Sequence, residues 1–69
     1  MEWRERITLD PQVLVGKPIV RGTRLSVAFI IGLFAQGWTM QHVLENYPDL
    51  CVEDVQECFA YASEMLSIG

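Results

Sequence analysis

The stretch LSVAFIIGLFA, residues 25–35, decides the fold of this chain. Apolar side chains occupy almost every position, so they would surround a helix instead of lining one face, and such a helix is buried on all sides. The stretch is too short to cross a bilayer, which needs roughly 20 apolar residues. Ser26 suits an N-cap and Gly37 suits a C-terminal stop. We therefore predict a buried helix that runs to about Gln36, and no membrane segment.

Two further helices are predicted downstream of this stretch. Thr39 is a suitable N-cap for a second helix that runs to about Asn46, and Pro48 prevents its continuation. A third helix is expected to begin near residue 51 or 52 and to reach about residue 65. Its apolar stripe, at helical spacing, is expected to contain Val55, Phe59, Ala62 and Leu66.

The residues before the first helix are typical of short strands. Arg4 to Leu9 alternate between polar and apolar side chains, and Ile19 to Arg21 form a second β-prone stretch. Pro18 has no amide hydrogen to donate, so this stretch is an arm or an edge strand. We predict a mainly α fold, in which an N-terminal β-arm or hairpin (residues 1–25) precedes a three-helix bundle (residues 26–69), together forming one domain.

Charge is distributed unevenly along the chain. The sequence contains five basic and nine acidic residues, for a net charge of −4. All the basic residues lie in the first 24 positions, whereas the chain from Leu25 onward contains six of the acidic residues and no Lys or Arg. Binding to nucleic acid needs clustered basic side chains. Only the N-terminal third of the chain can supply them.

The sequence offers no convincing catalytic or metal-binding arrangement. His42 is the only histidine, and a general base needs a partner that orients it. Cys51 and Cys58 are interpreted as buried free cysteines, because too few other ligands are present for a zinc site. The segment Gly16-Lys17-Pro18 lacks the spacing of a phosphate-binding loop. We expect no enzyme, no catalytic or metal-binding residue, no cofactor and no small-molecule substrate.

Acidic residues also gather at the start of the third helix. Glu53, Asp54 and Glu57 are interpreted as a solvated first turn and not as a metal cluster, because helix N-termini favour carboxylates.

The segment Gly16-Lys-Pro-Ile-Val-Arg-Gly-Thr-Arg24 is the best candidate for a binding site. Gly22 permits positive φ at a turn, and Arg21 and Arg24 lie on either side of it. Arginine binds phosphate or carboxylate groups through two parallel hydrogen bonds. A purely structural role is equally open, in which Arg24 pairs with a carboxylate of a neighbouring helix and Thr23 satisfies turn amides. The candidate partner-binding or nucleic-acid-binding residues are Arg4, Arg6, Lys17, Arg21, Thr23 and Arg24.

A homodimer is expected from the composition. Hydrophobic residues make up 51% of the 69 positions, and a chain this short buries only about 60% of its unfolded surface. The rest of so short a chain is too small to cover a helix that is apolar on all sides. The expected dimer interface consists of Ile19, Val20, Phe29, Ile30 and Phe34.

Several motifs together resemble one known family. They are Ile7-Thr-Leu-Asp-Pro11, the segment from Gly16 to Leu25, Tyr47-Pro-Asp-Leu50 and Ala60-Tyr-Ala62. The chain is similar to the bacterial domain-of-unknown-function family 433 from about Ile7 to Met65. It departs from the family pattern at Val15, where a glycine is common, and at Cys51, where a capping Thr or Ser is usual; the latter change weakens the cap by about 0.5–2 kcal/mol.

The resemblance implies a homeodomain-like, helix-turn-helix domain and an antitoxin encoded beside a PIN-like ribonuclease toxin. The expected partners are then a second copy, the toxin and operator DNA. The charged N-terminus, Met1-Glu-Trp-Arg-Glu-Arg6, does not resemble a signal peptide, so a cytoplasmic location is expected. The alternative function is that of a DNA-binding transcriptional regulator that uses the basic N-terminal arm, because the third helix has no basic residue and would be repelled by phosphates.

Overall fold

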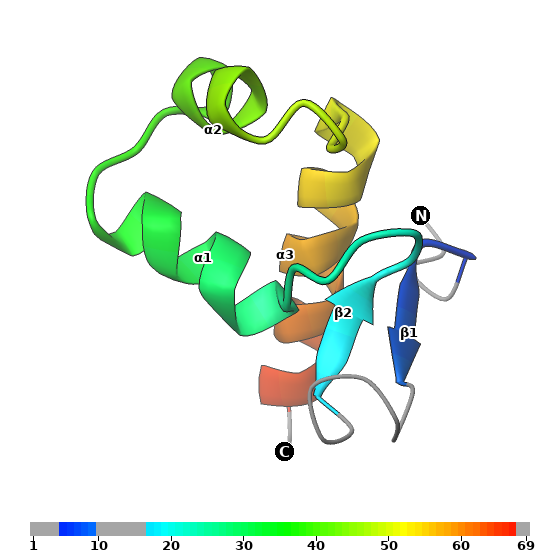
Figure 1. Cartoon of the computed structure of the whole chain (residues 1–69). Coiled ribbons are helices and arrows are strands. Elements are labelled where there is room, and N and C mark those ends of the chain that lie inside the picture. The colour runs from blue at the N-terminus through cyan, green and yellow to red at the C-terminus, as the bar shows by residue number, and fades with distance from the viewer. Residues whose placement is uncertain (1–4, 10–16, 68–69) are drawn as a thin grey trace.

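The computed structural model describes residues 5–9 and 17–67 of the chain (Figure 1). A two-stranded sheet precedes three helices, which confirms the mainly α fold with an N-terminal hairpin. The elements are β1 (Ile7–Leu9), β2 (Pro18–Val20), α1 (Val27–Ala35), α2 (Met40–Asn46) and α3 (Val52–Leu66).

The two strands form an antiparallel pair. Ile7 lies opposite Val20, and Leu9 lies opposite Pro18, which occupies the end of its strand. The chain then turns through Gly22, whose φ of 84° is in the left-handed region that glycine adopts without strain, as the sequence predicts. The turn brings the backbone back so that the amide of Val20 donates to the carbonyl of Leu25 at 3.0 Å.

Helix α1 begins and ends through local signals in the sequence. The Ser26 hydroxyl accepts a hydrogen bond from the amide of Phe29 at 3.0 Å, which confirms Ser26 as the N-cap. At the other end, Gly37 has a φ of 98°. The amide of Trp38 donates to the carbonyl of Leu33, and the amide of Gly37 donates to that of Phe34. These two bonds form a Schellman motif.

The next two helices also begin at the expected positions. The Thr39 hydroxyl caps α2 by accepting from the amide of His42 at 3.1 Å. Helix α3 begins after Cys51, whose amide donates to Oδ2 of Asp54 at 3.1 Å. The Asp54 carboxylate therefore supplies a reciprocal cap at a helix start where the capping position itself holds cysteine.

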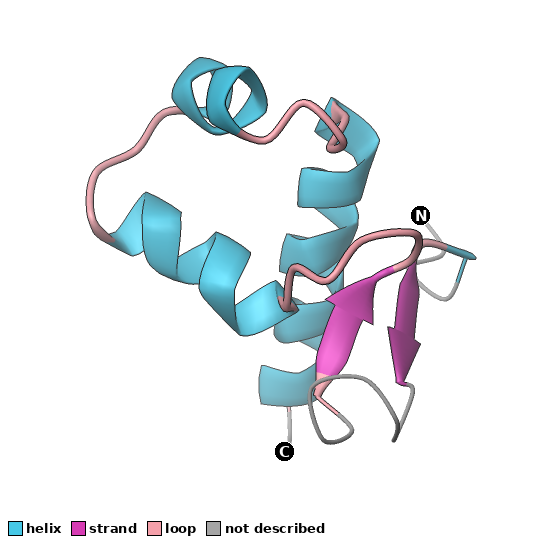
Figure 2. Cartoon of the chain, viewed as in Figure 1, coloured by secondary structure: helices cyan, strands magenta, loops and turns pink. Residues whose placement is uncertain are grey.

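The core lies where α1, α3 and the hairpin meet. Helix α1 packs against α3 and β2, and β1 packs against α3, while α2 and the hairpin lie at opposite ends of the molecule (Figure 2). The core cluster consists of Ile7, Val20, Val27, Ile30, Leu33, Val43, Leu50, Val55 and Cys58.

This packing corrects the expected dimer interface. Ile19, Val20 and Ile30 are 4%, 0% and 0% exposed within a single chain, so a second copy has no access to them. Phe29 and Phe34 reach the surface but are paired with other rings. Phe29 meets Tyr47 edge-on at 5.7 Å between centroids, and Phe34 meets Phe59 in the same way at 5.2 Å. These ring pairs cover part of the helix that the sequence presents as apolar on all sides.

Helix α3 differs from the sequence prediction in which side chains it buries. Val55 and Cys58 enter the core, but Phe59 remains 42% exposed and Leu66 82% exposed. The expected stripe faces α1, since Phe59 packs on Phe34 and Ala62 is half-buried, but of its four residues only Val55 is enclosed in the core. Glu57, expected in solvent, is 2% exposed, and its Oε2 atom has no hydrogen-bond partner within residues 5–9 and 17–67. Cys51, expected to be buried, is exposed.

Candidate binding groove and basic hairpin

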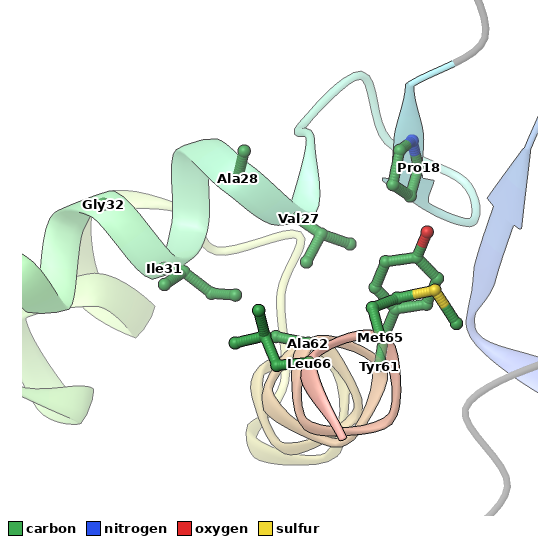
Figure 3. Close-up of a pocket in the computed structure, with 9 residues that line it drawn as sticks. All are labelled: Pro18, Val27, Ala28, Ile31, Gly32, Tyr61, Ala62, Met65 and Leu66. Carbon is green, nitrogen blue, oxygen red and sulfur yellow. The ribbon is translucent and has the colours of Figure 1, made fainter. Parts of the chain in front are cut away.

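An apolar groove runs between α1 and α3 and reaches Pro18 at the start of β2 (Figure 3). Its volume is about 470 Å³. Small side chains on the two helices leave the hollow between them, while larger side chains form its rim. The groove is lined by Pro18, Val27, Ala28, Ile31, Gly32, Tyr61, Ala62, Met65 and Leu66.

The shape of the groove follows from residue size. Ala28 and Gly32 lie one turn apart on α1, and a side chain on Gly32 would meet no atom within 4 Å of its Cβ. Met65 and Leu66, on the last turn of α3, are 44% and 82% exposed. Among the described residues that line the groove, Tyr61 alone has a polar side-chain group. An apolar patch of this kind on a small chain is a candidate surface for binding another molecule.

Sequence analysis did not identify this groove. The small residues of α1 and Ala62 are visible in the sequence, but residues 28 and 62 come together only because α1 packs on α3. The sequence signal for the groove is the apolar pair Met65 and Leu66, because they continue the third helix beyond the core.

Arg6, one of the predicted binding residues, is engaged within the chain. Its Nη1 atom lies 3.0 Å from Oδ1 of Asp54 and 3.5 Å from the sulfur of Cys51. The hydrogen bond to Asp54 raises the pKa of the Arg6 guanidinium, and the nearby Cys51 and Glu53 add to this effect. Arg6 therefore connects the start of the hairpin to the start of α3.

The turn after β2 uses two more of the predicted residues. The Thr23 hydroxyl donates to the carbonyl of Val20 at 2.8 Å and accepts from the amide of Leu25 at 3.0 Å. This is the structural role that the sequence left open for Thr23. The Arg21 Nε donates to the carbonyl of Glu5 at 3.2 Å and so ties the turn to the residues before β1.

Lys17 and Arg24 are exposed cations that the described contacts do not engage. Both side chains are in solvent, and within residues 5–9 and 17–67 neither is part of a hydrogen bond or ion pair. The alternative that Arg24 pairs with a carboxylate of a neighbouring helix does not occur there. Lys17 precedes Pro18, which lines the groove, whereas Arg24 lies beyond the turn. Arg4 lies outside the described residues.

The helix that would read DNA in a helix-turn-helix protein is acidic. Helix α3 contains Glu53, Asp54, Glu57 and Glu64 and no basic residue. In the part of the chain that the structure describes, no three His, Cys, Asp or Glu side chains are close enough to hold a metal ion. In the same part, every helix is too short or too polar to span a bilayer.

The fold and the groove together define a small, mainly α-helical domain in which a β-hairpin packs against two of the three helices and an apolar groove remains open. The chain belongs to the family described as "Protein of unknown function (DUF433)", whose family model matches residues 7–62. The resemblance at the level of sequence motifs is thereby confirmed.

Two relatives show how the domain occurs elsewhere. The chain is 37% identical over 59 residues to the uncharacterized protein y4eO of Sinorhizobium fredii, and the match covers 86% of this chain but 27% of that protein. The crystal structure of a DUF433 member from Anabaena variabilis superposes with a TM-score of 0.82 at 30% identity, covering 86% of this chain and 58% of that one. The chain thus spans about a quarter of the curated relative and somewhat more than half of the crystallised one.

Proposed function

We propose that this chain is a protein-binding module that acts in the cytoplasm as the antitoxin of a bacterial toxin–antitoxin pair. In this proposal, the groove takes an apolar helix of a PIN-like ribonuclease and keeps the enzyme inactive. The observation that carries the proposal is the groove itself, which is lined by apolar side chains from both helices and has Leu66 projecting at its rim.

The energetics favour a protein partner for this surface. Covering one exposed leucine contributes about 1.5–3 kcal/mol, and Leu66 is 82% exposed. Amphipathic helices commonly bind by laying their apolar face into such a groove. Lys17, next to Pro18 at the end of the groove, adds a cation that attracts carboxylates on the partner.

The exposed cations support a second candidate function, DNA binding by a homodimer with a helix-turn-helix layout. Lys17 and Arg24 are available for phosphate contacts, and dimerisation would double their number. Three features weigh against it. Arg6 is held by Asp54, Arg21 is bonded to the carbonyl of Glu5, and α3 is acidic.

The decisive experiment is co-expression with the product of the adjacent gene, followed by size-exclusion chromatography with light scattering and a ribonuclease assay. The antitoxin proposal predicts a defined complex in which ribonuclease activity is suppressed. A chain that elutes apart from its neighbour, and leaves any nuclease activity intact, contradicts it. A steep loss of DNA affinity with rising salt, measured in parallel, would support the regulator.

Variants of the groove locate the binding surface. Gly32→Leu fills the groove at a position where a new side chain meets open space, and Leu66→Asp places a charge on its rim. Both are expected to weaken the complex at least tenfold, the loss expected when one buried apolar anchor is removed, about 2 kcal/mol. Val52→Asp is the matched control, because Val52 is also an exposed apolar residue of α3 but does not line the groove. Equal effects of Leu66→Asp and Val52→Asp would place the partner elsewhere.

A further inference from the structure

A row of four aromatic rings lies along the α1–α2 side of the molecule. Phe29 meets Tyr47 edge-on at 5.7 Å, Tyr47 lies 6.3 Å from Trp38, and Trp38 stacks on His42 at 4.2 Å with 15° between the ring planes. None of the four residues lines the apolar groove. The row is therefore a separate feature of the surface.

The ends of this aromatic row are open to solvent while its centre is anchored. Phe29 is 43% exposed and His42 is exposed. Trp38 and Tyr47 are half-buried and pack against the core cluster. Aromatic side chains fixed in this way lose little entropy when a partner covers them, and such residues dominate the energetics of protein interfaces.

Two exposed acidic residues lie beside the α2 end of the row in the sequence. Glu45 lies three residues after His42 and thus on the same side of α2, and Asp49 lies two residues after Tyr47; both are exposed. The sequence contains no Lys or Arg after Arg24. A negative surface repels nucleic acid and attracts a positively charged partner.

We propose that the aromatic row is a docking surface for an arginine-bearing basic segment of a partner protein. A guanidinium group stacks on aromatic faces and also binds carboxylates through its planar fork, so one arginine can use both features of this surface. Lysine offers only a point charge and gains less from the rings. The proposal concerns a different surface from the groove and does not depend on the antitoxin function.

The test is a peptide titration followed through Trp38. Trp3→Phe leaves Trp38 as the only tryptophan, since the chain contains two, and serves as the parent. Hexa-arginine is expected to change Trp38 fluorescence saturably and to bind about two- to fivefold more tightly than hexa-lysine, the margin that a solvent-exposed cation–π contact provides. Amide shifts in ¹⁵N-labelled protein should concentrate at Phe29, Trp38, His42 and Tyr47. Equal affinity for the two peptides, or shifts centred on the groove, would overturn the proposal.

Matched substitutions separate specific docking from general charge attraction. Glu45→Gln and Glu64→Gln remove the same charge, but Glu64 lies near the far end of α3 from α2 (Figure 1). Only Glu45→Gln should weaken hexa-arginine binding, and Phe29→Ala should remove the preference for arginine over lysine while circular dichroism shows retained helix content. Equal effects of the two charge variants would refute the proposal. Shifts at the aromatic row that arise from raising the protein concentration alone would also refute it and assign the surface to a second copy.

Discussion

The guanidinium of Arg6 lies 3.0 Å from the carboxylate of Asp54, across 48 residues of sequence. The second oxygen of the same carboxylate accepts the amide of Cys51 at the start of α3. Asp54, 13% exposed, thus holds the hairpin to the helix and caps that helix at the same time. A residue that the sequence places in a solvated turn is a structural junction.

Substitutions at this junction should separate its two roles. Asp54→Ala removes the acceptor of the Cys51 amide and is expected to lower the free energy of unfolding by about 1–2 kcal/mol. Asp54→Asn keeps an acceptor and loses the charge, so its effect should be smaller and should shrink as salt is added. Arg6→Gln removes the ion pair but leaves the cap, so its loss in the free energy of unfolding should equal only the salt-dependent part of the Asp54→Ala loss. Urea denaturation at low and high salt measures all three, and identical losses for Asp54→Ala and Asp54→Asn would deny the capping role.

The Ser26 cap should be a measurable part of the stability of the chain. Ser26→Ala leaves the amide of Phe29 without its acceptor, and we expect a loss of about 0.5–2 kcal/mol in the free energy of unfolding. Ser63→Ala, an exposed change near the C-terminal end of α3, is the control and should stay within about 0.5 kcal/mol. Thermal unfolding followed by circular dichroism compares them, and a loss equal to that of the control would show that the cap contributes nothing.

The two cysteines should differ sharply in reactivity. Burial raises the pKa of the Cys58 thiol to about 12, and the carboxylates of Asp54 and Glu57 add to the shift, while Cys51 is exposed. Because the thiolate is the reactive form, a thiol reagent at pH 8 should label Cys51 quickly and Cys58 only after denaturation. Rapid labelling of both thiols in the folded protein would contradict the burial of Cys58.

The same thiol predicts a loss of stability in alkali. The unfolded chain releases the Cys58 proton near its ordinary pKa of 9.0, whereas the folded chain retains it up to about 12. The free energy of unfolding should therefore be unaffected by this group below pH 9 and should fall as pH rises from 9 toward 12. Comparing the pH profile with that of Cys58→Ala isolates the contribution, and identical slopes would exclude it.

Replacement of Glu57 should stabilise the chain. Its side chain is 2% exposed, and among the described residues Oε2 has no hydrogen-bond partner, so this oxygen loses its hydration without compensation. We expect Glu57→Met, which has a similar volume, to raise the free energy of unfolding by about 1–3 kcal/mol. Glu53→Met changes an exposed acidic residue of the same helix and serves as the control. A Glu57→Met variant less stable than the parent would mean that the carboxylate has a favourable role.

Local signals in the sequence predicted local structure well. Ser26 and Thr39 are caps because their hydroxyls bond amides three residues away, and Gly22 and Gly37 adopt the positive φ that a turn and a helix end require. Each of these features involves neighbouring residues only, so propensity and spacing are sufficient to predict it.

Features that depend on tertiary packing were predicted less well. The sequence alone gave no sign that β1 would cover part of α3, so it could not show that Arg6 meets Asp54 or that Ile30 is enclosed within one chain. The groove could not be predicted for the same reason, since Ala28 and Ala62 belong to helices that are distant in the sequence. Burial, unlike capping, depends on which distant segment packs against a residue.

The packing of β1 against α3 also has a consequence for biosynthesis. The strand at residues 7–9 completes its contacts only with a helix that begins at residue 52, so a growing chain on the ribosome lacks the partner of its first strand until that helix has emerged. Folding that relies on contacts between distant segments is delayed by the search for loop closure. During translation the first strand therefore stays without its helical partner until almost the whole domain has been made, and we expect its apolar face to remain accessible over that interval.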